Sequence, residues 1–130
     1  MSRKSKGINA ERELVHFFWK HGLAALRVAG SGSMRYPAPD VIVGNPKKRV
    51  VIECKACKGK IQYFTAQEIK ELSEFAALFD ALPYVGVRFD NKGWIFQHIK
   101  DLRKSGNLYG LGADVLKNTF SSEDIVKTFE

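Results

Sequence analysis

The sequence predicts one α/β domain in which a central sheet of about five strands is flanked by helices. Apolar residues recur at helical spacing near the start, short runs rich in β-branched residues follow, and a second helical pattern precedes two further runs. A chain of 130 residues is long enough to bury a core and short enough for one domain. We expect a single domain over residues 1–130, with a basic, flexible arm at 1–8 and a weaker pattern from about residue 100.

The first helix is expected over residues 9–21, with Asn9 as its N-cap and Gly22 closing it. Leu14, Val15 and Phe18 form its apolar stripe, and steps of three and four residues back from this stripe lead to Glu11. We therefore expect Glu11 on the core side of the helix.

Three strands are expected next, at residues 24–28, 40–43 and 50–55. The segment 29–39 contains glycines and prolines that exclude a regular element, and its composition is that of a functional loop. The turn at 44–48 predicts a hairpin between the second and third strands.

The second half of the chain is opened by a capping box, Thr65 with Glu68, which starts a helix reaching about residue 82 and ended by Pro83. Strands are expected at 84–89 and 94–98. The tail contains a glycine-rich loop and a short amphipathic segment opened by Ser121 or Ser122.

The net charge of the chain limits the kinds of molecule that it is expected to bind. A net charge of +7 on so short a chain attracts polyanions, with nucleic acid first and an anionic membrane surface second. The membrane alternative is weak, because no stretch approaches the roughly 20 apolar residues of a spanning helix. The basic start also lacks the apolar region of a signal peptide, so we expect a cytoplasmic protein.

Two cysteines occur, Cys54 and Cys57, with the spacing of half a zinc site. A second ligand pair is missing from the sequence, so core packing or a surface thiol is favoured over zinc or redox chemistry.

Three acidic residues are placed where they can converge. Glu53 and Lys55 lie two apart on a strand and share a face, and the hairpin brings Asp40 near Glu53. Glu11 joins them if the first helix packs on that face. For Glu53 and Lys55 alone, an exposed edge of an antiparallel sheet with solvated charges is the better interpretation.

The full pattern changes this balance. Pro39-Asp40, twelve intervening residues and Glu53-Cys54-Lys55 resemble the catalytic motif of restriction-endonuclease-like nucleases, which implies their mixed-sheet fold. Phosphodiester hydrolysis uses a hard cation held by carboxylates, here Mg²⁺ with Mn²⁺ as a substitute, and a lysine beside it can activate water or stabilise developing charge.

Further blocks narrow the resemblance to the archaeal Holliday-junction resolvase family over about the first hundred residues. They are residues 6–14, 22–27 with 29–33, 40–44, 51–55, and 85–88 with 93–94. Several ordered blocks in register are more specific than any single motif.

The resemblance implies roles for individual residues. Glu11, Asp40 and Glu53 would hold the metal, Lys55 would assist hydrolysis, and Ser31 would be required for cleavage. DNA contacts would come from Arg12, Arg27, Ser33 and Arg88. By ordinary statistics Arg12 is a solvated helix residue and Ser31 a turn residue, and only the motif favours the functional roles.

We therefore expect a homodimer that cuts four-way DNA junctions in recombination and repair, since symmetric cutting of two strands suits a two-fold dimer. The rival hypotheses are a restriction or repair nuclease acting on ordinary duplex, and a non-catalytic DNA-binding module. Clamp or helicase partners and any sequence preference are not specified by these residues.

Overall fold

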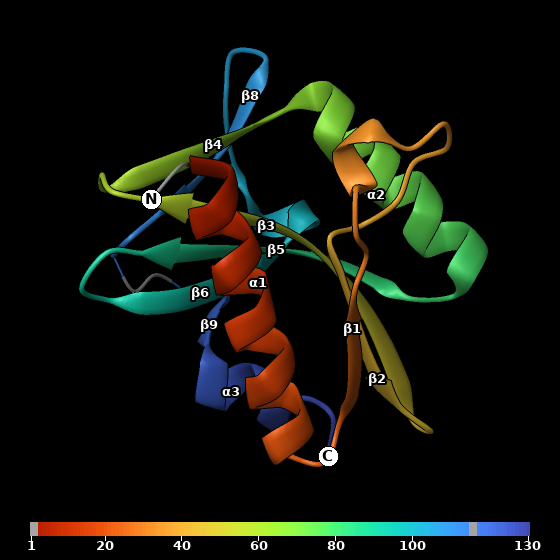
Figure 1. Ribbon diagram of the computed structural model, residues 1–130. Helices are drawn as coiled ribbons and strands as arrows, with labels where there is room; N and C mark the ends of the chain where they lie inside the picture. The colour runs from red at the N-terminus through yellow and green to blue at the C-terminus, as the bar shows by residue number, and fades with distance from the viewer. Residues whose placement is uncertain (1–2, 115–116) are drawn as a thin grey trace.

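The computed structural model describes residues 3–114 and 117–130, and Figure 1 shows its arrangement. The helices are α1 (Arg3–Lys20), α2 (Ala66–Phe79) and α3 (Ser122–Lys127), with 3-10 turns at Ser31–Ser33 and Ile99–Asp101. The strands are β1 (Ala24–Arg27), β2 (Val41–Asn45), β3 (Lys48–Cys57), β4 (Ile61–Thr65), β5 (Leu82–Phe89), β6 (Gly93–His98), β7 (Arg103–Ser105), β8 (Leu108–Gly112) and β9 (Thr119–Ser121).

The main sheet has six strands in the order β1-β2-β3-β5-β6-β9. Neighbouring strands are antiparallel except β3 and β5, which are parallel and are connected through β4 and α2. The sheet is therefore mixed, as predicted, with β9 as a sixth strand. The predicted hairpin is β2–β3, and its register pairs Val41 with Ile52.

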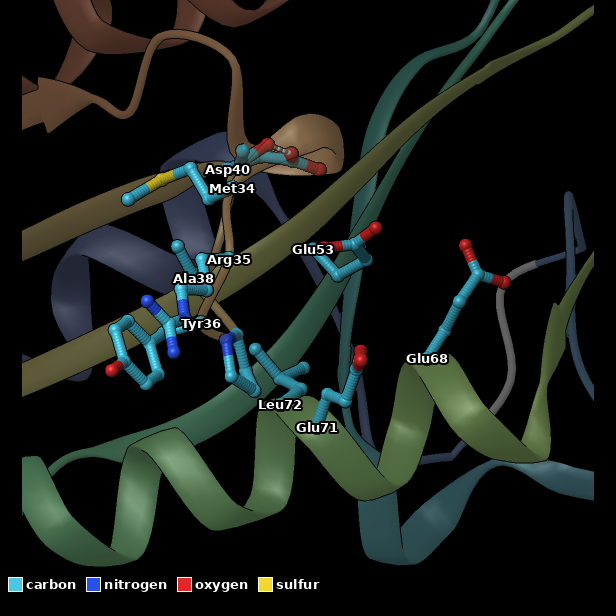
Figure 2. A pocket seen from close by; sticks show the side chains of 11 residues that line it. Met34, Arg35, Tyr36, Ala38, Asp40, Glu53, Glu68, Glu71 and Leu72 are labelled. Atoms are coloured by element: carbon cyan, nitrogen blue, oxygen red, sulfur yellow. Dashed lines mark hydrogen bonds between the residues drawn. The ribbon is translucent and has the colours of Figure 1, made fainter.

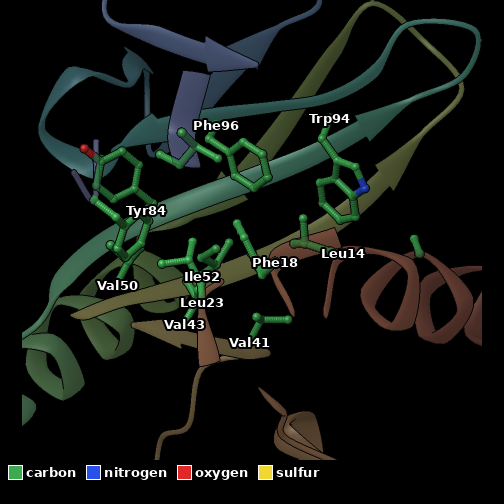
Figure 3. Packing of buried hydrophobic residues seen from close by; sticks show 13 residues of the cluster. Leu14, Phe18, Leu23, Val41, Val43, Val50, Ile52, Tyr84, Trp94 and Phe96 are labelled. Carbon is green, nitrogen blue, oxygen red and sulfur yellow. The ribbon is translucent and has the colours of Figure 1, made fainter. Parts of the chain in front are cut away.

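Strand β3 separates two hydrophobic clusters because successive side chains point to opposite faces of the sheet. Val50 and Ile52 pack with α1 and α3 in the cluster of Figure 3, whereas Val51 packs with α2 on the other face. In α1, Leu14 and Phe18 are fully buried, as the apolar stripe predicted. The sheet is thus covered by helices on both faces, and its middle strand carries the motif residues.

The first helix begins at Arg3, so the expected N-cap at Asn9 is wrong. Residues 3–8, expected to form a flexible arm, are helical, and residues 1–2 lie outside the described part of the chain. The Nζ atom of Lys6 lies 3.1 Å from the Asp90 carboxylate in the β5–β6 turn, and Ala10 is buried in the core. The Lys6–Asp90 contact stabilises the additional turns at the start of α1. Helical periodicity could not predict it, because the two residues are far apart in the chain.

Helix α2 has the predicted capping box and ends earlier than residue 82. The Thr65 hydroxyl accepts from the Glu68 backbone N–H, and the Glu68 carboxylate accepts from the Thr65 N–H. At the other end Asp80 adopts a left-handed conformation with φ 55°. Pro83 lies inside β5 opposite Val51, so it does not itself terminate the helix.

A second sheet, β4-β8-β7, was not expected from the sequence. It pairs Ile61 with Gly112 across fifty residues of chain, and part of the glycine-rich tail is therefore regular. A Cβ added at Gly110 would lie 3.1 Å from the Tyr63 ring, so glycine allows the two strands to approach with that ring between them. The final helix agrees with expectation, since Ser121 caps α3 by accepting from the Asp124 N–H. Across residues 3–114 and 117–130, no helix has the length and apolar character needed to span a membrane.

Candidate active site

Asp40 and Glu53 lie next to each other at the open end of the β2–β3 hairpin, away from its turn (Figure 2). The backbone N–H of Asp40 donates to the Ile52 carbonyl over 3.0 Å, which continues the hairpin register by one residue. Asp40 Oδ2 accepts from the Cys54 backbone N–H over 2.8 Å, and the Asp40 charge helps to raise the pKa of Glu53 across the ladder. The two carboxylates predicted to meet across the ladder therefore do so.

The surroundings of Glu53 oppose its negative charge. Burial raises the pKa of the Glu53 carboxyl to about 9, with further upward contributions from Asp40 and Glu68 and a smaller opposing one from Lys55. In the protein alone, Glu53 therefore keeps its proton near neutral pH, and a bound cation would displace that proton.

Ser31 completes the support of Asp40 from the loop between β1 and β2. Its Oγ donates to Asp40 Oδ1 over 2.5 Å, and the 3-10 turn that carries it follows Gly30, which is left-handed at φ 70°. The Ser31 hydroxyl thus orients a candidate metal ligand, and its role in cleavage stays a prediction.

Glu11 lies on α1 near the pair, and its carboxylate forms an ion pair with the Arg27 guanidinium. Arg27 Nε donates to Glu11 Oε1 over 2.9 Å, and the side chains of Arg27 and Glu11 are only 19% and 15% exposed. Burial raises the pKa of Glu11, Asp40 raises it further, and Arg27 opposes both. Glu11 is therefore close enough to sense Asp40 while its carboxylate is directed to Arg27.

Lys55 is held by a residue that the sequence analysis did not assign to the site. Its Nζ lies 2.9 Å from Glu68 Oε2 and 5.4 Å from the centre of the Phe64 ring. Glu68 had been interpreted only as half of the capping box. Its position three residues into α2 was visible in the sequence, but its direction toward β3 was not.

Asp40, Glu53 and Glu68 line a cavity of about 350 Å³ between the β1–β2 loop and α2. Figure 2 shows Glu68 and Glu71 projecting from α2 toward Glu53, with residues 34–38 of the loop on the opposite side. The cavity is open to solvent and rich in acidic groups, as a site for a hydrated cation and a phosphate would be.

The donor chemistry suits a magnesium ion. Mg²⁺ prefers hard oxygen ligands and is commonly held by one or two carboxylates together with waters, and Asp40 and Glu53 are such a pair. Within the described residues, no three His, Cys, Asp or Glu side chains are close enough to form a complete cage. The residues present fit a cation held by Asp40 and Glu53, and a third contribution from Glu11 stays a prediction.

Comparison with known proteins agrees with this geometry. The family model described as archaeal Holliday junction resolvase (hjc) matches residues 2–130. The chain belongs to this family. The match extends through the last thirty residues, beyond the blocks that had suggested the family.

Individual relatives of this resolvase family are similar over most of their length. Crossover junction endodeoxyribonuclease Hjc of Archaeoglobus fulgidus is 37% identical over 119 residues, which cover 86% of this chain and 88% of that protein. Hjc of Sulfolobus acidocaldarius is 30% identical over 134 residues, covering 100% and 92%. The solved structure of A. fulgidus Hjc, titled a Holliday junction resolvase from an archaeal hyperthermophile, superposes with a TM-score of 0.77 at 34% identity and covers 82% and 88%. The fold is accordingly restriction-endonuclease-like.

The four residues expected to contact DNA differ in exposure and in their partners. Arg12 is exposed on α1, and the Ser33 hydroxyl donates to the Gly30 carbonyl over 3.1 Å at the exposed loop. Arg88 Nε lies 3.0 Å from Glu13 Oε1 on α1. Arg12 is the most accessible of the predicted phosphate contacts, whereas Arg27 and Arg88 are already engaged by carboxylates.

The two cysteines of this resolvase chain lie on opposite faces of the sheet and are both unpaired. Cys54 packs against the α1 cluster and Cys57 belongs to the α2 cluster. Burial raises the pKa of the Cys54 thiol well above its ordinary value, so the thiol stays protonated. Cys57 is buried, as core packing predicted, and Cys54 is partly buried against the α1 cluster.

Proposed function

We propose that this protein is a magnesium-dependent endonuclease that resolves four-way DNA junctions by hydrolysing phosphodiesters at the site around Asp40 and Glu53. The observation that carries the proposal is the carboxylate pair at the mouth of an open cavity, with the motif lysine beside it. The crossover-junction names of the relatives point to the same substrate.

Each residue contributes a separate task. Asp40 and Glu53 would hold the cation, which when bound polarises a phosphate oxygen and makes water a stronger nucleophile. Ser31 keeps the Asp40 carboxylate in place by donating to Oδ1. The Lys55 ammonium is suited to stabilising negative charge that develops on the phosphate.

The deciding experiment incubates the protein with a synthetic immobile four-way junction and Mg²⁺, beside a linear duplex of matched sequence. We expect cuts in the junction and little or none in the duplex, because binding by charge and shape does not require base contacts. Equal cutting of both substrates would instead identify a nuclease for ordinary duplex.

Asp40→Asn and Glu53→Gln test the chemistry on the same substrate. Each variant should lose cleavage and keep junction binding in Ca²⁺, because a ligand charge is removed and the basic surface is not. Mn²⁺ should replace Mg²⁺ for the wild-type protein. Cleavage near the wild-type rate by both variants would contradict the metal site.

We infer further that the protein acts as a homodimer through the outer face of α2. Leu78 and Phe79 at the end of α2 are 93% and 42% exposed, and Leu82 at the start of β5 is 39% exposed. Phe75 and Phe79 pack ring against ring with centroids 5.4 Å apart. An exposed apolar group of this size on an otherwise charged protein is typical of a protein interface.

A further inference from the structure

Lys55 stands between two carboxylates that have different tasks. It shares a face of β3 with Glu53, two residues before it, and its charge opposes the raised pKa of that carboxyl. Its Nζ forms its ion pair with Glu68, at 2.9 Å, and the two side chains are 29% and 28% exposed. The lysine is therefore paired with the carboxylate that is not in the predicted metal site.

This choice of partner matters because a lysine ammonium sits on a flexible four-carbon stem. Without another acceptor, the nearest carboxylate on its own strand face is Glu53. An ion pair between Lys55 and Glu53 would occupy an oxygen that a cation requires. The ring of Phe64, 5.4 Å from Nζ, adds a second contact on the side of Glu68 and β4.

Glu68 is itself held in place at the start of α2. Its Oε1 accepts from the Thr65 backbone N–H over 2.9 Å, while Oε2 faces Lys55. One carboxylate thus caps a helix and receives the lysine, and the cap limits the rotamers open to it. The position of Lys55 is in this way tied to the N-terminus of a packed helix.

We propose that Glu68 is a positioning residue that holds the Lys55 ammonium apart from Glu53, so that Glu53 stays available to a cation and the ammonium stays beside the Glu68 carboxylate, which lines the cavity. The proposal rests on the proposed function for its cleavage assay. Its metal-binding assay uses the protein alone.

Glu68→Gln is the variant that tests this directly. A glutamine oxygen can still accept from the Thr65 N–H, so the cap is kept while the charge that attracts Lys55 is lost. We expect Mn²⁺ binding to the free protein, measured by calorimetry, to weaken by roughly 10-fold, and single-turnover cleavage in saturating Mg²⁺ to slow by roughly 10- to 100-fold. Junction affinity in Ca²⁺ should be unchanged.

A double-mutant cycle with Lys55→Ala separates positioning from a merely structural role. If Glu68 acts through Lys55, then Glu68→Gln should slow cleavage in the wild-type background and have almost no further effect once Lys55 is absent. Equal effects in the two backgrounds would overturn the proposal.

Two control variants account for charge and for the helix cap. Glu71 lines the same cavity one turn further along α2, and no ion pair joins it to Lys55, so Glu71→Gln removes the same charge. Thr65→Ala removes the capping hydroxyl and should lower the melting temperature while cleavage stays near wild type. A loss of Mn²⁺ affinity as large in Glu71→Gln as in Glu68→Gln, or wild-type behaviour of Glu68→Gln, would also overturn it.

Failure of the two proposals would look different. If the wild-type protein left the junction uncut, the proposed function would be wrong. Comparison of the Mn²⁺ affinities of Glu68→Gln and Glu71→Gln would still test the role of Glu68. If the wild type cut the junction and Glu68→Gln did so equally well, only the positioning role would fall.

Discussion

The Glu53 carboxyl group occupies surroundings that favour its uncharged form, since it is largely enclosed and lies beside Asp40. The same surroundings make Glu53 a good cation ligand. A bound divalent ion would offset both the free-energy cost of its buried negative charge and its repulsion by Asp40. Stability and metal binding are therefore linked at this residue through one proton.

That link predicts a pH dependence for the metal-free protein. The pKa of Glu53 rises from 4.5 to about 9 on folding, so its contribution to stability is complete at low pH and is lost as the pH rises through about 9. In EDTA, the melting temperature of the wild type relative to Glu53→Gln should fall between about pH 5 and 9. Adding Mn²⁺ at the upper end should raise it more for the wild type, and parallel pH curves for the two proteins would contradict the shift.

The positive side chains near the site predict separable defects. Arg12 is exposed, so Arg12→Ala should weaken junction binding in Ca²⁺ and reduce the salt slope by about one unit of log affinity per log salt. Arg27→Ala should do the same and also lower the melting temperature, because Glu11 loses its buried partner. Lys55→Ala should slow cleavage by orders of magnitude with little change in slope. An unchanged slope in both arginine variants would exclude them as phosphate contacts.

At the scale of the elements, Gly86 in β5 is tightly enclosed by side chains of β3 and β6. A Cβ built on Gly86 in β5 would lie 2.8 Å from the Phe96 ring and 3.1 Å from Ile52 Cγ2. Both neighbours are fully buried, so neither has space to retreat. Gly86 is paired with Cys54 in β3, so this close packing lies next to the motif residues.

Gly86→Ala should therefore destabilise the protein by about 1–3 kcal/mol through overpacking. Gly7→Ala is a matched control, because Gly7 lies within α1 and an added Cβ meets nothing within 4 Å. That change should stabilise by about 0.5–1 kcal/mol, as alanine favours a helix over glycine. Urea unfolding of both variants measures the pair, and a neutral Gly86→Ala would show that the core can give way.

At the scale of the whole molecule, a net charge of +7 and one exposed apolar helix face define two kinds of surface. Charge attracts the DNA, and the apolar face of α2 offers a contact for a second copy. Because α2 also carries Glu68 and Glu71 to the cavity, association through its outer face would place each copy's site at a set distance from the other.

Leu78→Glu should convert a dimer of about twice 14.6 kDa into a monomer in sedimentation at micromolar concentration, since a charge would be buried at the contact. Leu108→Glu is the control, because Leu108 is 40% exposed on the separate sheet of β8 and should leave the dimer intact. The monomer should lose paired cutting of the junction. A wild-type protein that is monomeric at every concentration would refute the interface.

Much of this protein is determined by its sequence, because the signals act between near neighbours in the chain. The turn before β3 sets the register that joins Asp40 to Glu53, and Thr65 and Ser121 cap their helices through groups three residues away. Ordered motif blocks also identified the family before any geometry was considered.

Tertiary structure decided the contacts between distant segments. Glu11 pairs with Arg27, Lys55 with Glu68, and the early start of α1 accompanies the contact of Lys6 with Asp90. The sheet of β4, β8 and β7 likewise joins segments that are far apart in the chain. The free energy of such contacts depends on packing that brings both partners together and removes water from them. The local spacing of residues does not predict that packing, so only the folded structure shows the partners of these side chains.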